Sequence, residues 1–336
     1  MFEGTSILIT GGTGSFGKAF IKTLLEDHNP HRVIIFSRDE LKQYEMRKLP
    51  EFRNDPRLRF FIGDVRDRDR LLRAFDGVDY VVHAAALKQV PACEYNPFEA
   101  IKTNILGAQN IIDAAIDRGV KKVVALSTDK ACNPVNLYGA TKLCSDKLFI
   151  AGNAYAGHAD TRFAVVRYGN VVGSRGSVIP FFLRQRETGR LPITHPEMTR
   201  FWITLDEGVQ FVLNSLKTMG GGELYIPKIP SMKIVDLARA IGPDCELDYI
   251  GIRGGEKLHE VMISEDDSRN TLDMGDYYLI TPEFTWWDSN GRWAREAGEP
   301  VEQGFRYSSD NNDHWLSIEE LQKIIRPIEE AMAEKA

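Results

Sequence analysis

A tyrosine and a lysine near the middle of the chain have the types and spacing to remove a proton from an alcohol. Tyr138 and Lys142 are four residues apart, so on a helix that begins near Asn136 their side chains share one face. The positive charge of an ammonium makes a neighbouring phenol easier to ionise. A Tyr-x-x-x-Lys spacing is a frequent accident on helices, so its place in the chain decides what it means.

A hydroxyl, a carboxyl and an amine lie just before that helix. Thr128, Asp129 and Lys130 follow the apolar run at residues 123–126, which predicts a buried parallel strand. Ligands bind at the C-terminal ends of strands in a doubly wound sheet. Adjacent residues of a strand point to opposite faces, so Asp129 and Lys130 reach one ligand only if the strand has already ended. Pro134 favours such an early turn.

A glycine-rich loop near the N-terminus predicts a dinucleotide site. An apolar strand pattern at residues 6–10 leads into a G-x-x-G-x-x-G spacing, a helical stretch and a second strand, as a βαβ unit requires. Glycines let the backbone turn tightly and approach a pyrophosphate at the helix N-terminus. The loop residues expected to contact the cofactor are Gly11, Thr13, Gly14, Ser15, Phe16 and Gly17.

The end of the second strand bears on the choice between NAD and NADP. NAD binders usually place an acid there, whereas this chain has Ser37 and Arg38, with Lys42 one turn further on. These side chains are suited to hold a 2′-phosphate, although Asp39 would repel it if it faced the same way. The sequence therefore favours NADP. Further cofactor contacts are expected from Asp64, Val65, Ala84, Ala85, Ala86, Tyr138 and Lys142.

Composition narrows the class of protein. The 336 residues, 43% of them hydrophobic, predict one large or two moderate domains with a real core. A formal net charge of -6 argues against nucleic acid as the main partner. No apolar run is long enough to span a bilayer and no signal peptide is recognisable, so we expect a cytoplasmic protein without membrane partners. The four cysteines are scattered and the histidines lack ligand spacing, so no metal is expected.

Alternating strand and helix patterns predict an α/β fold, a doubly wound parallel Rossmann sheet with a smaller interleaved C-terminal substrate-binding lobe. From about Gly173, short apolar pieces broken by prolines are typical of such a lobe. A helix near residues 206–217 and a strand at 223–226 are expected to return to the main sheet. The expected domains are residues 1–172 with 200–227 for the cofactor, and 173–199 with 228–336 for the substrate.

Several motifs carry a family resemblance. They are the glycine loop, the Tyr138 and Lys142 pair, Leu126-Ser127-Thr128-Asp129-Lys130-Ala131, residues 167–178, and Arg253-Gly254-Gly255-Glu256-Lys257. Together they resemble the extended short-chain dehydrogenase/reductase superfamily over nearly the whole chain. Within it they look most like the inverting UDP-N-acetylglucosamine 4,6-dehydratases, which serve pseudaminic acid biosynthesis and flagellin glycosylation. Retaining dehydratases carry a glutamate at the position of Lys130.

The resemblance implies a lyase that uses NADP without consuming it. Tyr138, assisted by Lys142 and Thr128, would take the C4 hydroxyl proton as hydride leaves C4. Asp129 and Lys130 would then serve as acid for the departing 6-hydroxyl and base for C5. We expect these two to share one proton, because a neutral pair spares two buried charges. Inversion at C5 gives UDP-2-acetamido-2,6-dideoxy-beta-L-arabino-hex-4-ulose.

The resemblance also implies residues that bind a UDP-sugar. Asn170 would hold the diphosphate, Arg253 would clamp it and Glu256 would accept a hydrogen bond from the ribose, although a structural salt bridge equally explains the last two. The weaker candidates are Lys88, Ser177, Thr194 and Arg200. Related enzymes are oligomers, so a homo-oligomer is expected.

Four alternatives stay open. A 4-epimerase shares the glycine loop and the Tyr-Lys pair, but it needs no acid–base pair at C5 and C6. A C5-retaining dehydratase differs at the position of Lys130. An NADP-sensing scaffold on the same fold usually loses the Tyr-Lys pair. Finally, Lys130 itself could serve only to bind substrate phosphate.

Overall fold

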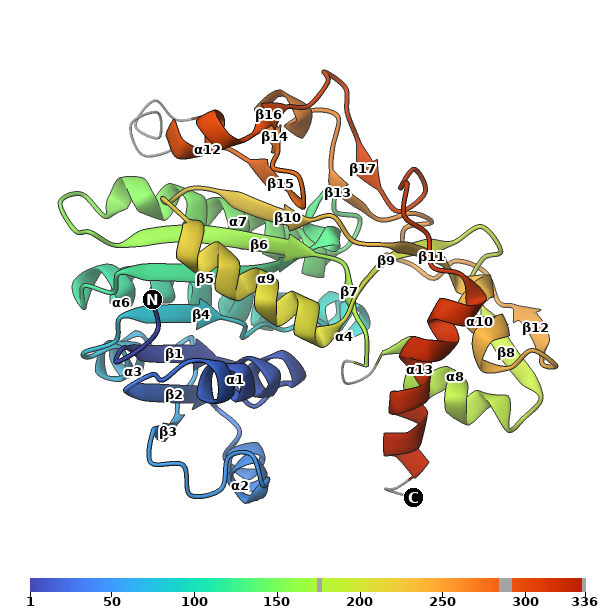
Figure 1. The fold of residues 1–336 in the computed structure, drawn as a ribbon, viewed down its shortest axis with the longest axis horizontal. Coiled ribbons are helices and arrows are strands. Elements are labelled where there is room, and N and C mark those ends of the chain that lie inside the picture. The colour runs from blue at the N-terminus through green and yellow to red at the C-terminus, as the bar shows by residue number, and fades with distance from the viewer. Residues whose placement is uncertain (174–176, 284–291, 334–336) are drawn as a thin grey trace.

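A ten-stranded sheet forms the centre of the computed structural model, which describes residues 1–173, 177–283 and 292–333 (Figure 1). From β3 to β10 its strands run parallel, and β15, β14 and β16 extend one edge in antiparallel fashion. In order across the sheet the strands are β16 (Glu299–Pro300), β14 (Thr271–Asp273), β15 (Tyr277–Ile280), β10 (Leu224–Pro227), β6 (Arg162–Tyr168), β5 (Lys122–Thr128), β4 (Tyr80–His83), β1 (Ser6–Thr10), β2 (Arg32–Ser37) and β3 (Leu58–Ile62).

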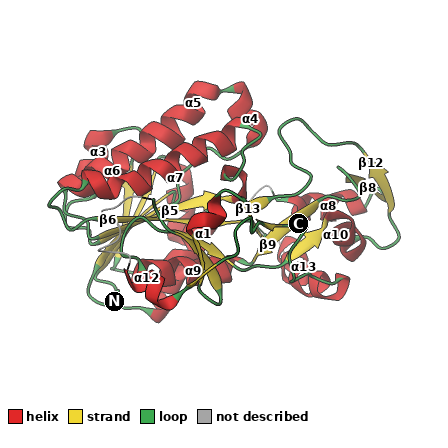
Figure 2. Cartoon of the chain, turned by 90° about the horizontal axis from the view of Figure 1, so that it is seen from above, coloured by secondary structure: helices red, strands yellow, loops and turns green. Residues whose placement is uncertain are grey.

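Helices cover both faces of this sheet, which confirms the doubly wound α/β prediction (Figure 2). One face carries α3 (Arg68–Ala74), α6 (Gly107–Asp117) and α7 (Leu137–Tyr155), and the other carries α1 (Ser15–Asp27) and α9 (Leu205–Thr218). The central strands of a parallel sheet that is covered on both sides are largely out of water, so they are rich in apolar residues. All five residues of β1 are accordingly buried.

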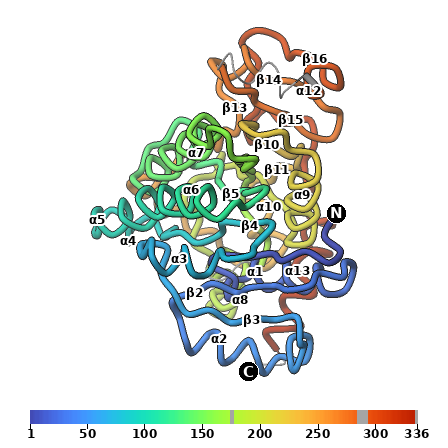
Figure 3. The backbone as a smooth tube through the Cα atoms, turned by 90° about the vertical axis from the view of Figure 1, so that its left-hand side faces the viewer, coloured from blue at the N-terminus to red at the C-terminus, as the bar shows by residue number. Residues whose placement is uncertain are grey.

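The two edges of the sheet lie at opposite ends of the molecule (Figure 3). Helix α2 (Glu40–Lys48) lies beside β3, and α12 (Arg292–Ala297) lies beside β14 and β16. Two small sheets lead away from the large one. They are β11 (Ser231–Lys233), β9 (Thr199–Ile203) and β7 (Asn170–Val171), and the pair β13 (Val261–Ile263) with β17 (Tyr307–Ser308).

A smaller lobe has its own apolar core beside the sheet (Figure 1). It comprises α8 (Val178–Arg186), α10 (Ile234–Ile241), α13 (Ile318–Ala333) and the parallel pair β8 (Arg190–Ile193) with β12 (Glu246–Tyr249). Helix α13 is amphipathic. Its buried residues Leu321 and Ile325 belong to the core of the lobe, against α8 and α10, so this apolar side is already covered within the chain.

The structure differs from the expectation that residues 228–336 all belong to the lobe. Strands β14, β15 and β16 lie on the edge of the main sheet, and Leu272 and Leu279 belong to its core. Conversely, β9 lies in a small sheet, whereas α9 and β10 return to the main sheet as expected. Short apolar strands look alike in any sheet, so the sequence pattern does not show which one they join. Residues 174–176, within the motif at 167–178, lie outside the described residues.

The first turn of α7 packs closely on the backbone that precedes it. A Cβ added at Gly139 would overlap the carbonyl oxygen of Lys130, which lies in the short 3₁₀ turn η2 (Asp129–Ala131). The helical glycine Gly208 of α9 is a matched control, because its added Cβ would meet only Ile203 Cδ1, at 3.9 Å.

Replacing Gly139 by alanine should destabilise the fold by about 1–3 kcal/mol through overpacking. Gly208→Ala should be neutral or stabilise it by up to about 1 kcal/mol, since alanine is the better helix former. Thermal unfolding of both variants beside the wild-type protein checks this. An unchanged Tm for Gly139→Ala would contradict the tight contact between α7 and η2.

Candidate active site

The turn after β5 brings an acid and an amine together. Strand β5 ends at Thr128, whose Oγ1 accepts a hydrogen bond from the Lys130 amide at 3.4 Å at the start of η2. Asn133, with φ 46°, continues the reversal of the chain. As a result Lys130 Nζ donates to Asp129 Oδ1 at 2.9 Å, and Thr128 Oγ1 donates to the same oxygen at 2.9 Å. The predicted early departure from strand geometry is therefore confirmed.

Helix α7 begins at the predicted position and is tied to the chain around it. Asn136 is its N-cap and accepts from the Gly139 amide at 2.8 Å. The Asn136 Nδ2 also donates to the Gly255 carbonyl at 2.7 Å, which fixes the 253–257 segment against the helix. Tyr138 and Lys142 follow one turn apart on α7, as predicted.

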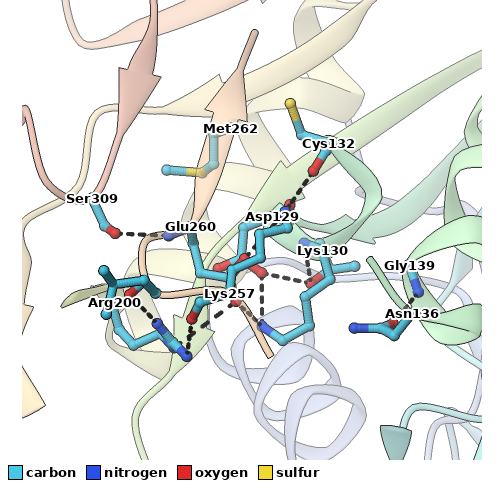
Figure 4. A network of polar contacts seen from close by, with 12 residues as sticks. Asp129, Lys130, Cys132, Asn136, Gly139, Arg200, Lys257, Glu260, Met262 and Ser309 are labelled. Atoms are coloured by element: carbon cyan, nitrogen blue, oxygen red, sulfur yellow. Dashed lines mark hydrogen bonds and ion pairs between the residues drawn. The ribbon is translucent and has the colours of Figure 1, made fainter. Parts of the chain in front are cut away.

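Glu260 extends the Asp129–Lys130 pair into a buried cluster of five charged groups (Figure 4). Its Oε1 lies 3.3 Å from Lys130 Nζ and 3.9 Å from Arg200 Nε. Its Oε2 lies 3.4 Å from Lys257 Nζ, which also donates to the Cys132 carbonyl at 2.6 Å. Two carboxylates thus face three cations, so the cluster carries one excess positive charge when all five groups are ionised.

This arrangement sets the charges of the individual groups. Burial raises the pKa of Asp129, whose Oδ2 has no hydrogen-bond partner in the described part of the chain. Burial would lower the pKa of Lys130, but the carboxylates of Asp129 and Glu260 outweigh it and raise that pKa above its ordinary value. For Glu260 burial is outweighed by Lys130, Arg200 and Lys257, so its pKa is lowered. Glu260 adds a second carboxylate beside Lys130, and this favours the ammonium form over the neutral amine expected from Asp129 and Lys130 alone.

Burial also dominates the Tyr138 and Lys142 pair. It raises the pKa of Tyr138 to about 12, while the charge of Lys130 and a hydrogen bond with Thr128 act in the opposite direction. Burial lowers the pKa of Lys142, and the Asp146 carboxylate opposes this. The expected lowering of the phenol's pKa by Lys142 is thus not what the structure shows, because desolvation is the larger effect.

A second buried ion pair lies one helical turn beyond Lys142. Asp146 Oδ2 accepts from the Ser127 hydroxyl at 2.6 Å and pairs with Arg167 at 3.4 Å. Arg167 also donates to the Met262 carbonyl at 2.9 Å. These contacts hold β5, β6, α7 and β13 together beneath the Tyr138 and Lys142 pair.

The glycine loop has the close backbone contacts that a dinucleotide site requires. A Cβ on Gly11, which has φ 67°, would lie 3.0 Å from Ala85 Cα, so this loop runs directly beside the alanines after β4. A Cβ on Gly17 would overlap Gly12. Gly14 caps α1 and leaves its first turn without a side-chain cap. A pyrophosphate fits this loop, because both backbone access and the helix N-terminus are available.

Most of the remaining cofactor candidates lie near the C-terminal ends of β1, β2 and β4. Thr13 and Ser37 hydroxyls lie 3.0 Å apart, and the amides of Ala84 and Ala85 both donate to Thr10 Oγ1 at 3.2 Å. The ring of Phe16 stacks on the ring of Phe20, and Val65 packs beneath α6. Ser15 is the first residue of α1, and Ala86 follows Ala85 in the chain.

The residues expected to favour NADP are engaged with carboxylates. Lys42 pairs with Asp39 at 2.6 Å, and Asp39 also caps α2 by accepting from the Lys42 amide. Arg38 lies 3.8 Å from Asp64, whose main partner is Arg66 at 2.7 Å. All three ion pairs are partly exposed, where such interactions are weak, so a phosphate would compete with them at small cost.

The substrate candidates fall into two groups. Burial of the Lys88 amine, together with the nearby charge of Lys130, lowers the pKa of Lys88. Asn170 is half-buried on β7, Thr194 follows β8, and Ser177 precedes α8 with a buried hydroxyl that lacks a partner in the described part of the chain.

The other three substrate candidates are bound to protein groups. Arg200 donates to the carbonyls of Thr199, Leu258 and Lys257 and pairs with Glu260, so its guanidinium is held by groups of the protein. Arg253 and Glu256 form the alternative salt bridge with each other, at 2.5 Å. Arg253 remains exposed, so it is still accessible to an anion.

Sequence reasoning missed three residues of this region. Glu260 and Lys257 complete the charge cluster, and their spacing of three residues beside the Arg-Gly-Gly-Glu motif was the available signal. Asn104 is buried, and its side chain accepts from the Leu87 amide at 2.8 Å and donates to the Leu87 carbonyl at 2.9 Å. These two bonds hold the chain just before Lys88. An asparagine within an apolar helix marks such a role.

Two further properties concern the described residues as a whole. Among them there is no cluster of three or more histidine, cysteine or acidic side chains arranged to hold a metal ion. Nor does any helix in the described ranges have the length and apolar character to cross a membrane.

Comparison with known proteins adds to this geometry. A family model described as "Polysaccharide biosynthesis protein" matches residues 7–282. The chain is 58% identical over 335 residues to the UDP-N-acetylglucosamine 4,6-dehydratase (inverting) of Campylobacter jejuni, covering 98% of this chain and 99% of the relative. It is also 42% identical over 334 residues to a UDP-glucose 4-epimerase of Rickettsia canadensis, covering 97% and 96%.

The fold has solved counterparts as well. The crystal structure of DesIV, a dTDP-glucose 4,6-dehydratase from Streptomyces venezuelae with NAD and TYD bound, is similar with a TM-score of 0.68 and 25% identity. The match covers 87% of this chain and 97% of that one. The matched family, the full-length relatives and this fold agree with one another. The chain therefore belongs to the polysaccharide biosynthesis protein family, within the extended short-chain dehydrogenase/reductase superfamily.

Proposed function

We propose that this protein is a lyase that removes water from UDP-N-acetylglucosamine across C5 and C6, with NADP as cofactor and inversion at C5. The product would be UDP-2-acetamido-2,6-dideoxy-beta-L-arabino-hex-4-ulose, for pseudaminic acid biosynthesis. The observation that carries the proposal is the contact between Lys130 Nζ and Asp129 Oδ1 at the end of β5, beside Tyr138 and Lys142. The 58% identity to an inverting dehydratase supports the same reaction.

Each proposed role follows from the position and charge of a side chain. The glycine loop would hold NADP⁺, which would supply the hydride acceptor needed at C4 and the hydride donor needed at C6. Tyr138 takes the C4 hydroxyl proton, with Thr128 and Lys142 beside it to stabilise the phenolate. The resulting ketone acidifies C5, which makes the elimination possible.

Asp129 and Lys130 are suited to that elimination as a pair. The pKa of Asp129 is raised by burial, so the carboxyl can hold a proton and give it to the departing 6-hydroxyl. When the Lys130 proton passes to Asp129 across their 2.9 Å contact, the same transfer leaves an amine that can remove the C5 proton. One proton transfer therefore creates the acid and the base together.

Proton NMR of the protein with UDP-N-acetylglucosamine in D₂O should show a new C6 methyl signal and deuterium at C5. Ring-proton couplings of the L-arabino product are expected, because inversion delivers the C5 proton from the opposite face. D-xylo couplings would instead indicate retention and contradict the role given to Lys130. A new C4 epimer without a methyl signal would favour the epimerase alternative, which the 42% identical relative keeps open.

Substitutions should separate oxidation from elimination. Lys130→Met and Asp129→Asn should each lower the rate of C5 deuterium exchange by about 10²–10⁴-fold, because they remove the acid–base pair. Transient NADPH absorbance, which reports C4 oxidation, should largely persist in both. Tyr138→Phe is the matched control that should abolish the NADPH signal itself. Equal loss of both signals in the Lys130 variant would contradict this division of roles.

Cofactor choice can be tested at the end of β2. Arg38→Ala should weaken NADP binding about tenfold or more, because it removes a charge-assisted contact to the 2′-phosphate. Affinity for NAD, which lacks that phosphate, should stay nearly the same. Arg190→Ala, at an exposed salt bridge to Glu246 in the lobe, is the control. Titration calorimetry with both cofactors gives the answer, and a preference for NAD in the wild-type protein would contradict the NADP assignment.

A further inference from the structure

The buried cluster contains a carboxylate that the proposed reaction does not use. Glu260 is 2% exposed and lies just before β13, far from η2 in sequence. Its backbone is held on both sides, because the Glu260 amide donates to Ser309 Oγ at 2.9 Å and its carbonyl accepts from the Ser309 amide at 2.8 Å. Ser309 Oγ is in turn 2.7 Å from Thr199 Oγ1. The Glu260 backbone is thus held by segments from three parts of the chain, and its carboxylate pairs with Arg200 and Lys257.

The Glu260 carboxylate lies beside the side-chain amine of Lys130. Lys130 Nζ lies between Asp129 Oδ1 at 2.9 Å and Glu260 Oε1 at 3.3 Å, while the Lys130 side chain is still 25% exposed. A flexible lysine in contact with only one acid on its own turn would sample other positions. A second, buried carboxylate favours positions of the amine in which it contacts both acids.

We propose that Glu260 is a positioning residue for Lys130, which holds the amine against Asp129 and determines where the proton of the Asp129–Lys130 pair resides. The inference deepens the proposed dehydration and rests on it. A negative charge beside Lys130 favours the ammonium form, and so it opposes transfer of the proton to Asp129. Glu260 thereby keeps the base protonated in the resting enzyme.

Other charged groups face the same amine and are included in the argument. Asp129 acts with Glu260, while Arg200 from β9 acts against them. Lys88, from the segment before α4 (Val90–Tyr95), and Tyr138 from α7 are also within electrostatic range of Lys130. Among these groups, only the two carboxylates contact Lys130 Nζ at 3.3 Å or less in the described residues.

The test measures the pKa of the Lys130 amine directly. Trace labelling of the purified holoenzyme with acetic anhydride over a range of pH, read by peptide mass spectrometry, reports this pKa without any turnover. In Glu260→Gln the pKa of Lys130 should fall by about one to three units, because one of its two anionic partners becomes neutral. Glu329→Gln, which removes an exposed partner of Arg186 in the lobe, is the matched control and should leave it unchanged.

A second variant serves as a control for misfolding of Glu260→Gln. Glu260→Gln leaves an excess of positive charge in the cluster, whereas Glu260→Gln with Lys257→Met restores its original net charge. The double variant should show the same fall in the pKa of Lys130. An unchanged pKa in either folded variant would overturn the proposal. If neither variant folded while Glu329→Gln did, Glu260 would be a stability residue and the proposal would also fall.

A catalytic readout separates this inference from the proposed function. In Glu260→Gln the pH profile of C5 deuterium exchange should move to lower pH, while the profile of C4 oxidation keeps its position. A merely structural role would lower both rates without moving either profile, and that result would count against the proposal. If the wild-type protein did not act on UDP-N-acetylglucosamine, the labelling result would still decide whether Glu260 controls Lys130.

Discussion

Parallel pairing of β1, β4, β5 and β6 is the constraint on which the site depends. The C-terminal ends of these parallel strands lie side by side. The residues that follow them therefore lie close together, although they are far apart in sequence. Gly11 after β1 touches Ala85 after β4, and Asp129 follows β5 directly. The residues proposed to bind cofactor and substrate therefore lie near one another at the ends of these strands.

Burial is the second constraint, and it explains why charges occur in opposed sets. His83, at the end of β4, is fully buried; desolvation, with a smaller effect of Lys142, lowers its pKa to about 3, and its ring contacts Thr10. It therefore stays neutral. Lys130 and Glu260 retain charge because each has partners of opposite sign, whereas burial raises the pKa of Asp129. The same low-dielectric surroundings that make the site costly to build make its proton transfers sensitive to single residues.

Local signals were enough to predict much of this arrangement. The strand before Thr128, the early turn after it and the helix starting at Asn136 all follow from apolar periodicity, proline and capping residues. The motif spacing could have pointed to Glu260, but its contact with Lys130 could not be predicted, because it joins segments whose pairing only the tertiary fold decides. For the same reason the expected exposure of Arg200 to ligand differs from the structure, where carbonyls of residues 199, 257 and 258 surround it.

The path of the last hundred residues has a consequence for how the molecule is made. After β10 the chain enters the lobe at α10, returns to the main sheet at β14 and β15, and continues into the lobe at α13. Neither core is complete until the C-terminal residues have been synthesised, and both depend on contacts between distant parts of the sequence. Such topology makes folding slow and late. The nascent chain must therefore remain without its final packing while it leaves the ribosome.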